Sequence, residues 1–381
     1  MNLWFLLMLG VSLLALAGGL FFVCKLKRFE CIRKIGHGKK WLNFLVRILL
    51  VVCPTALMWI FWGNINAVIA LIHLLVFWLL SDLIFYIVRR IRKKKFTRYY
   101  AGIVAILFTI VWLGIGWYQA HHVWEKTYTI ETDKSVGNIR IALISDSHTG
   151  TTFHAKGFAK HMKEIEAQNP DVVLVAGDFV DDDTTKEDMI GCCKALSEMK
   201  TKYGVYYVFG NHDKGYYGDA YRGYSGQDLI NELEANGVIV LQDESVLIDD
   251  RFYIIGRQDR SEEMSYGGVT APGRASMEEL TNDLDDTKFS IVMDHQPDDY
   301  DNQAAVGVDL VVSGHTHGGQ LWPLMDIESI PGLGPDDLVY GFEKRGNTNF
   351  IVTSGISDWA IKFKTGCRSE YVIVDIEGDV H

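Results

Sequence analysis

Four long apolar runs occupy the first third of the chain, and polar or basic residues separate them. The runs are residues 3–23, 42–62, 67–88 and 99–118. Each is close to the roughly 20 residues that a helix needs to cross the hydrocarbon core of a membrane. The pattern predicts a membrane domain of four transmembrane helices over residues 1–120. The first run could instead be a cleaved signal peptide, but it lacks a basic start and is too long for that assignment.

Beyond residue 120 the pattern changes to short apolar strands that alternate with polar helical stretches. Strands are predicted at 139–144, 172–176, 205–209, 238–241, 245–248, 252–255, 289–293, 310–313, 350–353 and 371–375, with helices at 156–168 and 186–199. These are too many strands for one simple parallel sheet. The pattern predicts an α/β sandwich, in which two packed β-sheets are flanked by helices. This domain is expected to span 139–381, after a stalk at 121–138 that holds one edge strand at 127–131.

The two regions differ sharply in charge. Residues 1–120 contain fifteen Lys and Arg against two acids, which leaves 22 basic and 46 acidic residues in 121–381, a net charge of −24 there. Nucleic-acid phosphates are held mainly by Lys and Arg, so no nucleic-acid partner is expected. The adjacent Cys192 and Cys193 are poorly placed to pair with each other, and free, packed thiols are expected.

The basic residues of the first region also predict its orientation. They gather at 25–40 and 89–98, whereas 63–66 carries no charge. Loops rich in Lys and Arg stay on the cytoplasmic side of a membrane, so four crossings would place everything after residue 118 outside the cytoplasm. We expect an integral protein of the cell membrane with an extracytoplasmic second domain. For the polar Asp82, Arg47 and His73 inside the spans, interhelical hydrogen bonds or helix-end anchoring are preferred over a functional role.

Polar residues of one chemical kind follow five of the predicted strands. The five segments are Asp146-Ser147-His148, Gly177-Asp178, Gly210-Asn211-His212-Asp213, Asp294-His295 and Gly314-His315-Thr316-His317. In α/β folds the carboxyl ends of the strands are where ligands bind. The sequence therefore predicts that these five segments converge on one edge of the domain.

The side chains in these segments are carboxylates, an amide and imidazoles, with no thiolate. Such ligands suit hard or borderline divalent metals, of which manganese is expected and iron or zinc are alternatives. Asp146 and His148 are two residues apart, so on an extended strand end their side chains point the same way; His315 and His317 repeat this spacing. Each element alone would be weak, because a strand-end Asp often caps a helix and a lone His is usually structural. Five of them together are not expected from packing needs.

Taken in order, the D-x-H, G-D, G-N-H-D, H-x-P and G-H-x-H elements resemble the calcineurin-like metallophosphoesterase superfamily over 139–376. The resemblance implies a pair of divalent metal ions. It implies that one ion is held by Asp146, His148, Asp178 and His317, and the other by Asp178, Asn211, His295 and His315, with Asp178 as the bridge. It further implies that a water or hydroxide between the ions attacks phosphorus.

The resemblance also assigns a role to the histidine that is not a ligand. His212, held by Asp213, would lie near the leaving group, where it could act as a general acid or only bind phosphate. The run Gly318-Gly319-Gln320 resembles the membrane-associated bacterial branch, some of whose members cleave lipid-linked phosphoesters or pyrophosphates. That branch tends to have an Arg in the segment matching 354–365, where this chain has Lys362 and Lys364.

Two further features each have a purely structural interpretation as well as a functional one. The three carboxylates of 181–183 could bind a third metal, but a solvated face or a charged helix start is expected. The aromatic tract 215–226 and the loop 322–338 could wall a pocket or simply pack.

Together these patterns predict a membrane-anchored, dinuclear-metal-dependent phosphohydrolase. Its substrate would be a phosphodiester, monoester or pyrophosphate, and a lipid-linked one suits a domain held at the bilayer. The alternative is a catalytically silent metal-binding membrane sensor or scaffold.

Overall fold

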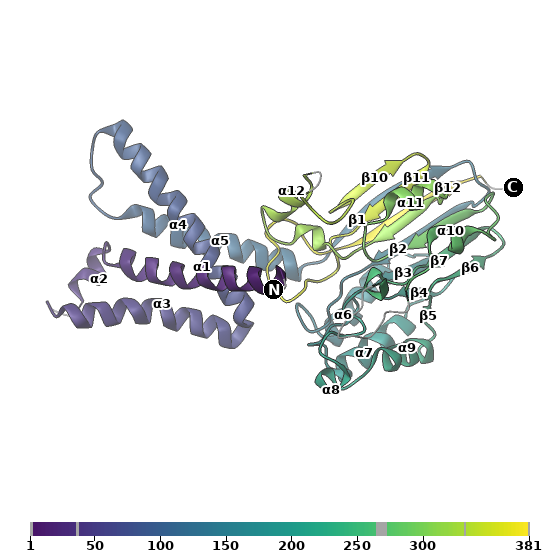
Figure 1. Ribbon diagram of the computed structural model, residues 1–381, viewed down its shortest axis with the longest axis horizontal. Coiled ribbons are helices and arrows are strands. Elements are labelled where there is room, and N and C mark those ends of the chain that lie inside the picture. The colour runs from purple at the N-terminus through teal and green to yellow at the C-terminus, as the bar shows by residue number, and fades with distance from the viewer. Residues whose placement is uncertain (1–2, 36–37, 264–272, 331–332, 380–381) are drawn as a thin grey trace. The chain divides into compact units, whose positions relative to one another are not determined.

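The computed structural model describes residues 3–35, 38–263, 273–330 and 333–379. The chain divides into two compact units, Met1–Gly116 and Trp117–His381 (Figure 1). The sequence pattern put this division near residue 120.

The first unit is helical. Its helices are α1 (Leu3–Leu26), α2 (Glu30–Lys34), α3 (Lys40–Trp62), α4 (Asn64–Arg92) and α5 (Tyr100–His121), the last of which continues past the unit boundary. The four long helices predicted from the apolar runs are confirmed, and each is long and apolar enough to cross a membrane. Helix α3 buries none of its residues, and large apolar side chains such as Ile60 and Phe61 are 75% and 73% exposed. A helix that is apolar on all sides is typical of contact with lipid.

A small core joins these helices. It consists of Phe22, Leu26, Ile32, Leu75, Trp78 and Ala105. The polar residues inside the helices hydrogen-bond between or within them, as expected: Arg47 Nη1 donates to the Val23 carbonyl at 2.8 Å, and Asp82 accepts from the Tyr99 hydroxyl at 2.7 Å.

The second unit is built on two six-stranded sheets. The first, in the order β1-β12-β2-β3-β4-β5, comprises β1 (Trp124–Thr132), β12 (Glu370–Gly378), β2 (Asn138–Ile144), β3 (Val172–Ala176), β4 (Val205–Val208) and β5 (Ile239–Val240). The second, in the order β10-β11-β9-β8-β7-β6, comprises β10 (Gly341–Arg345), β11 (Thr348–Val352), β9 (Leu310–Ser313), β8 (Phe289–Met293), β7 (Phe252–Gly256) and β6 (Glu244–Ile248). Strands β2 to β5 run parallel, as do β7, β8, β9 and β11.

Helices connect these strands and cover the outer faces of the sheets (Figure 1). They are α6 (Ala155–Glu166), α7 (Lys186–Ser197), α8 (Asp219–Arg222), α9 (Gly226–Ala235), α10 (Met277–Thr281), α11 (Tyr300–Ala305) and α12 (Leu324–Glu328), with 3-10 turns η1 (Arg260–Glu263) and η2 (His317–Gly319).

Alternate residues of a strand serve two different core layers. In β3, Val173 and Val175 pack in the cluster beneath α6, α7 and α9, whereas Leu174 and Ala176 pack between the sheets. A third cluster joins the outer face of the second sheet to α10 and α11. Because both faces of each sheet are covered, its central strands are apolar throughout. The predicted α/β sandwich of two packed sheets flanked by helices is confirmed.

The two edge strands compare differently with the sequence pattern. The edge strand predicted at 127–131, within the expected stalk, is present as the longer β1, which pairs with β12 along nine residue pairs and so forms part of the first sheet. Strand β10, which pairs antiparallel with β11, was not predicted at all. Both have polar, half-exposed sequences, because only one side of an edge strand is paired and only part of its surface is buried.

Candidate metal centre

The five polar segments lie at the carboxyl ends of parallel strands from both sheets. Asp146 and His148 follow β2, Asp178 follows β3, and Asn211 comes three residues after β4. From the second sheet, His295 follows β8, while His315 and His317 follow β9. The loops that follow these strands of the two packed sheets thus meet at one site, as the strand pattern predicted.

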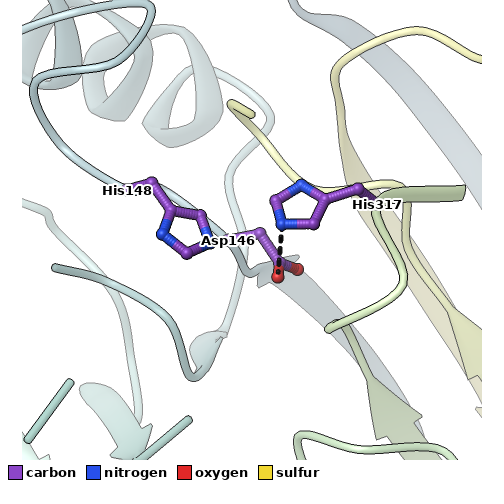
Figure 2. Close-up of side chains that lie close together, drawn as sticks. All are labelled: Asp146, His148 and His317. Carbon is purple, nitrogen blue, oxygen red and sulfur yellow. Dashed lines mark ion pairs between the residues drawn. The ribbon is translucent and has the colours of Figure 1, made fainter. Parts of the chain in front are cut away.

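The predicted ligands gather in two groups. In the first, Asp146, His148 and His317 each offer one ligand atom, and these atoms lie within 4.8 Å of one another (Figure 2). His317 Nε2 and Asp146 Oδ1 are 3.5 Å apart. In the second group, Asp178, His295 and His315 meet the same condition. The chain therefore has two candidate sites for divalent metal ions.

Asp178 lies between the two groups. Its Oδ2 atom is 3.5 Å from His148 Nε2 in the first group and 3.2 Å from His295 Nε2 in the second. Its other oxygen, Oδ1, accepts the backbone N–H of His212 at 2.8 Å. One carboxylate is thus fixed at a position from which it can reach both sites.

Several atoms of these side chains are buried without a hydrogen-bond partner among the described residues: His148 Nε2, His295 Nε2 and Asn211 Oδ1. In each of these side chains the other polar atom has a hydrogen-bond partner. His295 Nδ1 must donate to the Ala176 carbonyl at 2.7 Å, which leaves the Nε2 lone pair free when the ring is neutral. Asn211 Nδ2 donates to the Tyr216 hydroxyl at 2.7 Å, which leaves its Oδ1. Unpaired buried lone pairs are costly, and a cation would satisfy them, so these residues fit a metal site.

The four histidines differ in their pKa values. Burial lowers the pKa of His148, but neighbouring carboxylates, first the hydrogen-bonded Asp181, outweigh it and raise the pKa to about 9. The same balance holds the pKa of His295 well above its ordinary value. Burial, together with a neighbouring protonated histidine, lowers the pKa of His315 to about 4 and that of His317 well below its usual range. In each group, burial and a neighbouring positive charge favour the neutral form of one ring, whereas carboxylates favour the protonated form of the other, whose proton a bound cation would displace.

The backbone at the site is strained. Five of the seven predicted ligands have left-handed backbone: Asp146, His148, Asp178, His315 and His317, with φ between 33° and 69°. Such conformations cost on the order of 1 to 3 kcal/mol each in residues other than Gly, and they persist where the surroundings enforce them. Gly314 is required for a different reason, because a Cβ there would lie 2.3 Å from Asp146 Oδ2. Clustered strain of this kind is typical of functional sites.

Asp213 does not hold His212 as the sequence led us to expect. Its carboxylate instead accepts four backbone N–H groups, from Asp178, Phe179, Val180 and Gly210, at 2.7 to 3.0 Å. Those bonds shape the loop that presents Asp178. The expected Asp–His pair is absent in the described structure because Asp213 is buried beneath the loop.

His212 itself borders both groups. Its ring centroid lies 5.0 Å from that of His148, and the rings of Tyr216 and Trp359 lie at 5.0 and 5.3 Å. Burial, partly offset by the charge of Asp178, lowers the pKa of His212. Tyr216 and Trp359 are 47% and 38% exposed, so an aromatic surface adjoins this histidine at the mouth of the site.

The carboxylates of 181–183 do not form the expected solvated face. Asp181 and Asp182 are 6% and 9% exposed. Asp181 Oδ2 lies 3.2 Å from His148 Nδ1, and Asp182 accepts the backbone N–H of Tyr216 at 3.0 Å. Asp181 thus orients a predicted ligand. In the sequence, the only signal for this role of Asp181 was its position three residues after Asp178.

Lys364 does not stand in for a phosphate-binding arginine. Its side chain is fully buried, and its Nζ donates to the carbonyls of Ser354 and Gly355. Gln320 of the Gly-Gly-Gln run is bonded to the Asp358 carboxylate and, at 3.0 Å, to the Trp359 carbonyl. Both residues therefore support the loop that carries Trp359. Of the aromatic residues in 215–226, Tyr224 is buried, whereas Tyr217 and Tyr221 are exposed.

Comparison with known proteins agrees with this description. Residues 139–319 match the model of the calcineurin-like phosphoesterases. An uncharacterized metallophosphoesterase of Aquifex aeolicus is 31% identical over 200 residues, which cover 52% of this chain and 70% of that protein. An uncharacterized metallophosphoesterase of Campylobacter jejuni is 28% identical over 255 residues, covering 66% of this chain and 63% of that protein.

The chain is also similar to a relative that is named as a transmembrane protein. The transmembrane protein with metallophosphoesterase domain of Danio rerio is 27% identical over 247 residues, covering 62% of this chain and 53% of that protein. Fold and comparisons agree on the class of the second unit, which is that of the metallophosphoesterase domains. The chain belongs to the calcineurin-like phosphoesterase family. It spans less than two thirds of the length of the Campylobacter jejuni and Danio rerio relatives.

Proposed function

We propose that the chain is a membrane-anchored phosphohydrolase that uses two divalent metal ions at Asp146, His148, Asp178, Asn211, His295, His315 and His317. One observation carries the proposal: Asp178 Oδ2 lies between the two groups, 3.5 Å from His148 and 3.2 Å from His295. Manganese is the proposed metal, since the donor set is all oxygen and imidazole nitrogen.

The chemistry follows from what such ions supply and from what the chain adds. A pair of bound divalent ions lowers the pKa of a shared water and neutralises charge on the phosphoryl oxygens. Asp178 would hold both ions, and Asp213 fixes the loop that presents Asp178. His212 stands beside the groups as the proposed proton donor to the leaving oxygen, or as a phosphate contact.

The proposed substrate is a phosphoester at or near the bilayer, with a lipid-linked ester or pyrophosphate as the favoured form. Two features support it: four helices long enough to cross a membrane, and exposed aromatic rings beside His212. The net charge of −24 over 121–381 disfavours nucleic acid. We assign residues 1–120 as the anchor and 139–381 as the catalytic domain, on the extracytoplasmic side.

The test uses the full chain, purified in detergent with Mn²⁺. Hydrolysis of p-nitrophenyl phosphate, bis-p-nitrophenyl phosphate and a lipid-linked diphosphate is measured for the wild type and for Asp178→Asn. Loss of metal polarisation is worth several kcal/mol, so we expect a fall of roughly a thousandfold. Asp183→Asn, an exposed carboxylate five residues away, is the matched control.

Unchanged hydrolysis in Asp178→Asn would contradict the proposal. A wild type that binds two Mn²⁺ per chain and cleaves none of the three substrates would favour the silent sensor or scaffold instead.

A further inference from the structure

A second site lies in the helical unit, far along the chain from the candidate metal centre. A pocket of about 480 Å³ opens where α1 and α4 end and α5 begins. It is lined by Lys25, Arg28, Asp82, Phe85, Tyr86, Arg89, Lys95, Phe96, Arg98, Tyr99, Tyr100 and Ala101.

The pocket is strongly cationic. Five of its lining residues are Lys or Arg, and one is an acid. Asp82 is already engaged: it pairs with Lys25, accepts from the Tyr99 hydroxyl at 2.7 Å, and lies 4.0 Å from Arg28. In the described part of the chain no carboxylate pairs with Arg89, Lys95 or Arg98. Glu30 interacts electrostatically with Arg98, so the described carboxylates balance the positive charge of the pocket only in part.

The floor of the pocket is rigidly built. The buried Trp78 donates from Nε1 to the Tyr99 hydroxyl at 2.8 Å, and that hydroxyl donates to Asp82. The Phe29 ring packs edge-on against both Trp78 and Tyr99, at 6.2 and 5.3 Å. This chain of contacts fixes Asp82, and Asp82 fixes Lys25. The cations therefore border a preformed cavity rather than a frayed helix end.

An apolar surface continues from the pocket along α5. Tyr100 and Ala101 line the pocket, and Val104, Leu107 and Phe108 follow them on the same side of the helix and are 44%, 58% and 46% exposed. Phe85, Tyr86 and Phe96 line the pocket itself, where aromatic side chains suit the level of the lipid headgroups. A ligand with a negative head and an apolar body would match both surfaces.

We propose that this pocket binds the phosphate of an anionic phospholipid headgroup, with the acyl chains against α5. Basic pockets between membrane helices on the cytoplasmic side are known to bind such headgroups, and the basic loops predict that side here. The site is separate from the proposed hydrolysis and does not depend on it. The lipid would be a bound structural or regulatory ligand.

The segment after α4 supplies a matched control. Arg92, Lys93 and Lys94 are exposed cations in the same stretch, but they do not line the pocket. Removing three charges from either set changes the orientation signal of the loop equally. The two sets therefore separate binding in the pocket from general attraction to a negative surface.

Binding is measured with the full chain in a nonionic detergent, using fluorescently labelled phosphatidylglycerol. The pocket variant carries Arg89→Gln, Lys95→Gln and Arg98→Gln, and the control carries Arg92→Gln, Lys93→Gln and Lys94→Gln. Since each cation near a lipid headgroup contributes measurably, we expect the pocket variant to lose about tenfold or more in affinity and the control less than about threefold. A charge-preserving variant, Arg89→Lys with Arg98→Lys, keeps the positive charges that attract the headgroup and should bind within about threefold of the wild type, which shows that substitution here is tolerated.

Two further arms identify the source of the phosphate. Phosphatidylcholine, which has a phosphate but no net charge, should bind more weakly than phosphatidylglycerol, and millimolar inorganic phosphate should not displace the labelled lipid. Equal losses in the pocket and control variants would overturn the proposal, as would equal binding of the two lipids. Full displacement by inorganic phosphate would overturn the lipid assignment in favour of a soluble phosphate.

Discussion

Individual residues at the candidate metal centre are constrained by backbone as well as by side-chain chemistry. Asp146 and Asp178 hold left-handed φ values of 55° and 50°. Asn tolerates this region better than other residues except Gly, whereas a β-branched residue is strongly disfavoured there. Asn is therefore the substitution that removes the charge with the least disturbance of the loop.

The buried Asp181 carries a prediction about metal affinity. Its carboxylate is 3.2 Å from His148 Nδ1, which orients the ring so that Nε2 faces the first group. Partners of this kind typically change metal affinity by about 10- to 100-fold, so Asp181→Asn should weaken binding of Mn²⁺ by that factor. Calorimetric titration of the full chain with Mn²⁺ measures the effect. Asp183→Asn should bind as the wild type does, and equal affinities in all three proteins would refute the role of Asp181.

His212 carries a prediction about the leaving group. A proton donor matters most when the departing oxygen is a poor leaving group and little when it is p-nitrophenolate. His212→Gln should therefore lower kcat by about a hundredfold or more on an alkyl phosphoester, but by less than about tenfold on the p-nitrophenyl ester. His122→Gln, at an exposed histidine outside the site, is the control. Equal losses on both esters would indicate that His212 binds phosphate and does not donate a proton.

Among the elements, α6 and α7 are joined by one carboxylate near their first turns. Asp188 accepts from the Ala155 N–H at 2.9 Å, from His154 Nδ1 at 2.8 Å and from the Thr185 hydroxyl that caps α7. Burial raises the pKa of Asp188, but these hydrogen bonds lower it by more, so the pKa lies below its ordinary value of 3.8. A carboxylate with a lowered pKa stabilises the fold above its unfolded pKa, and this contribution disappears as the pH falls through the folded pKa.

Asp188→Asn should therefore destabilise the protein at neutral pH and cease to do so in acid. One such hydrogen-bonded group contributes about 1 kcal/mol, which corresponds to a melting temperature roughly 2 to 4 °C lower in a unit of this size. Thermal unfolding measured at pH 7 and in steps down to pH 2 shows whether the difference from the wild type shrinks in acid. Glu187→Gln, an exposed neighbour in the same turn, should have little effect at any of these pH values. A deficit in Asp188→Asn that stays constant from pH 7 to pH 2 would exclude the charge as its cause.

Central strands could be predicted from the sequence more completely than edge strands. The strands that present Asp146, Asp178 and His295 are buried on both faces, so their continuous apolar runs were visible without a structure. Strands β1 and β10 are edges with mixed polarity, so β1 was predicted only over 127–131 and β10 was not predicted. That β1 pairs with β12, and β10 with β11, is visible only in the formed sheets.

The same distinction applies within the site. The predicted ligands follow strands directly, so their meeting could be foreseen from the parallel arrangement. The roles of Asp213 and Asp181 depend on contacts across loops, 33 to 35 residues apart in sequence, that no local pattern encodes. Spacing alone suggested an Asp–His pair, whereas burial turned Asp213 toward four backbone N–H groups.

At the scale of the whole molecule, the charge difference between the two regions predicts topology. Fifteen Lys and Arg, most of them at 25–40 and 89–98, should keep those loops in the cytoplasm. Alkaline phosphatase folds only where disulfides form, so its fusion after residue 381 should be active and its fusion after residue 94 inactive. Green fluorescent protein fused at the same positions should give the opposite result. Active phosphatase at residue 94 would overturn the proposed orientation.

The place of β12 in the first sheet has a consequence for how the second unit is made. Strand β12 lies between β1 and β2, so residues 124–132 and 138–144 do not pair with each other. Both strands pair with residues 370–378, which are synthesised last of the three. During synthesis both earlier strands wait with unpaired edges, which is the state most open to wrong pairing. The sheet is complete only when β12 pairs with both β1 and β2. A nascent chain interrupted before residue 370 would therefore hold every predicted metal ligand and still have a split sheet.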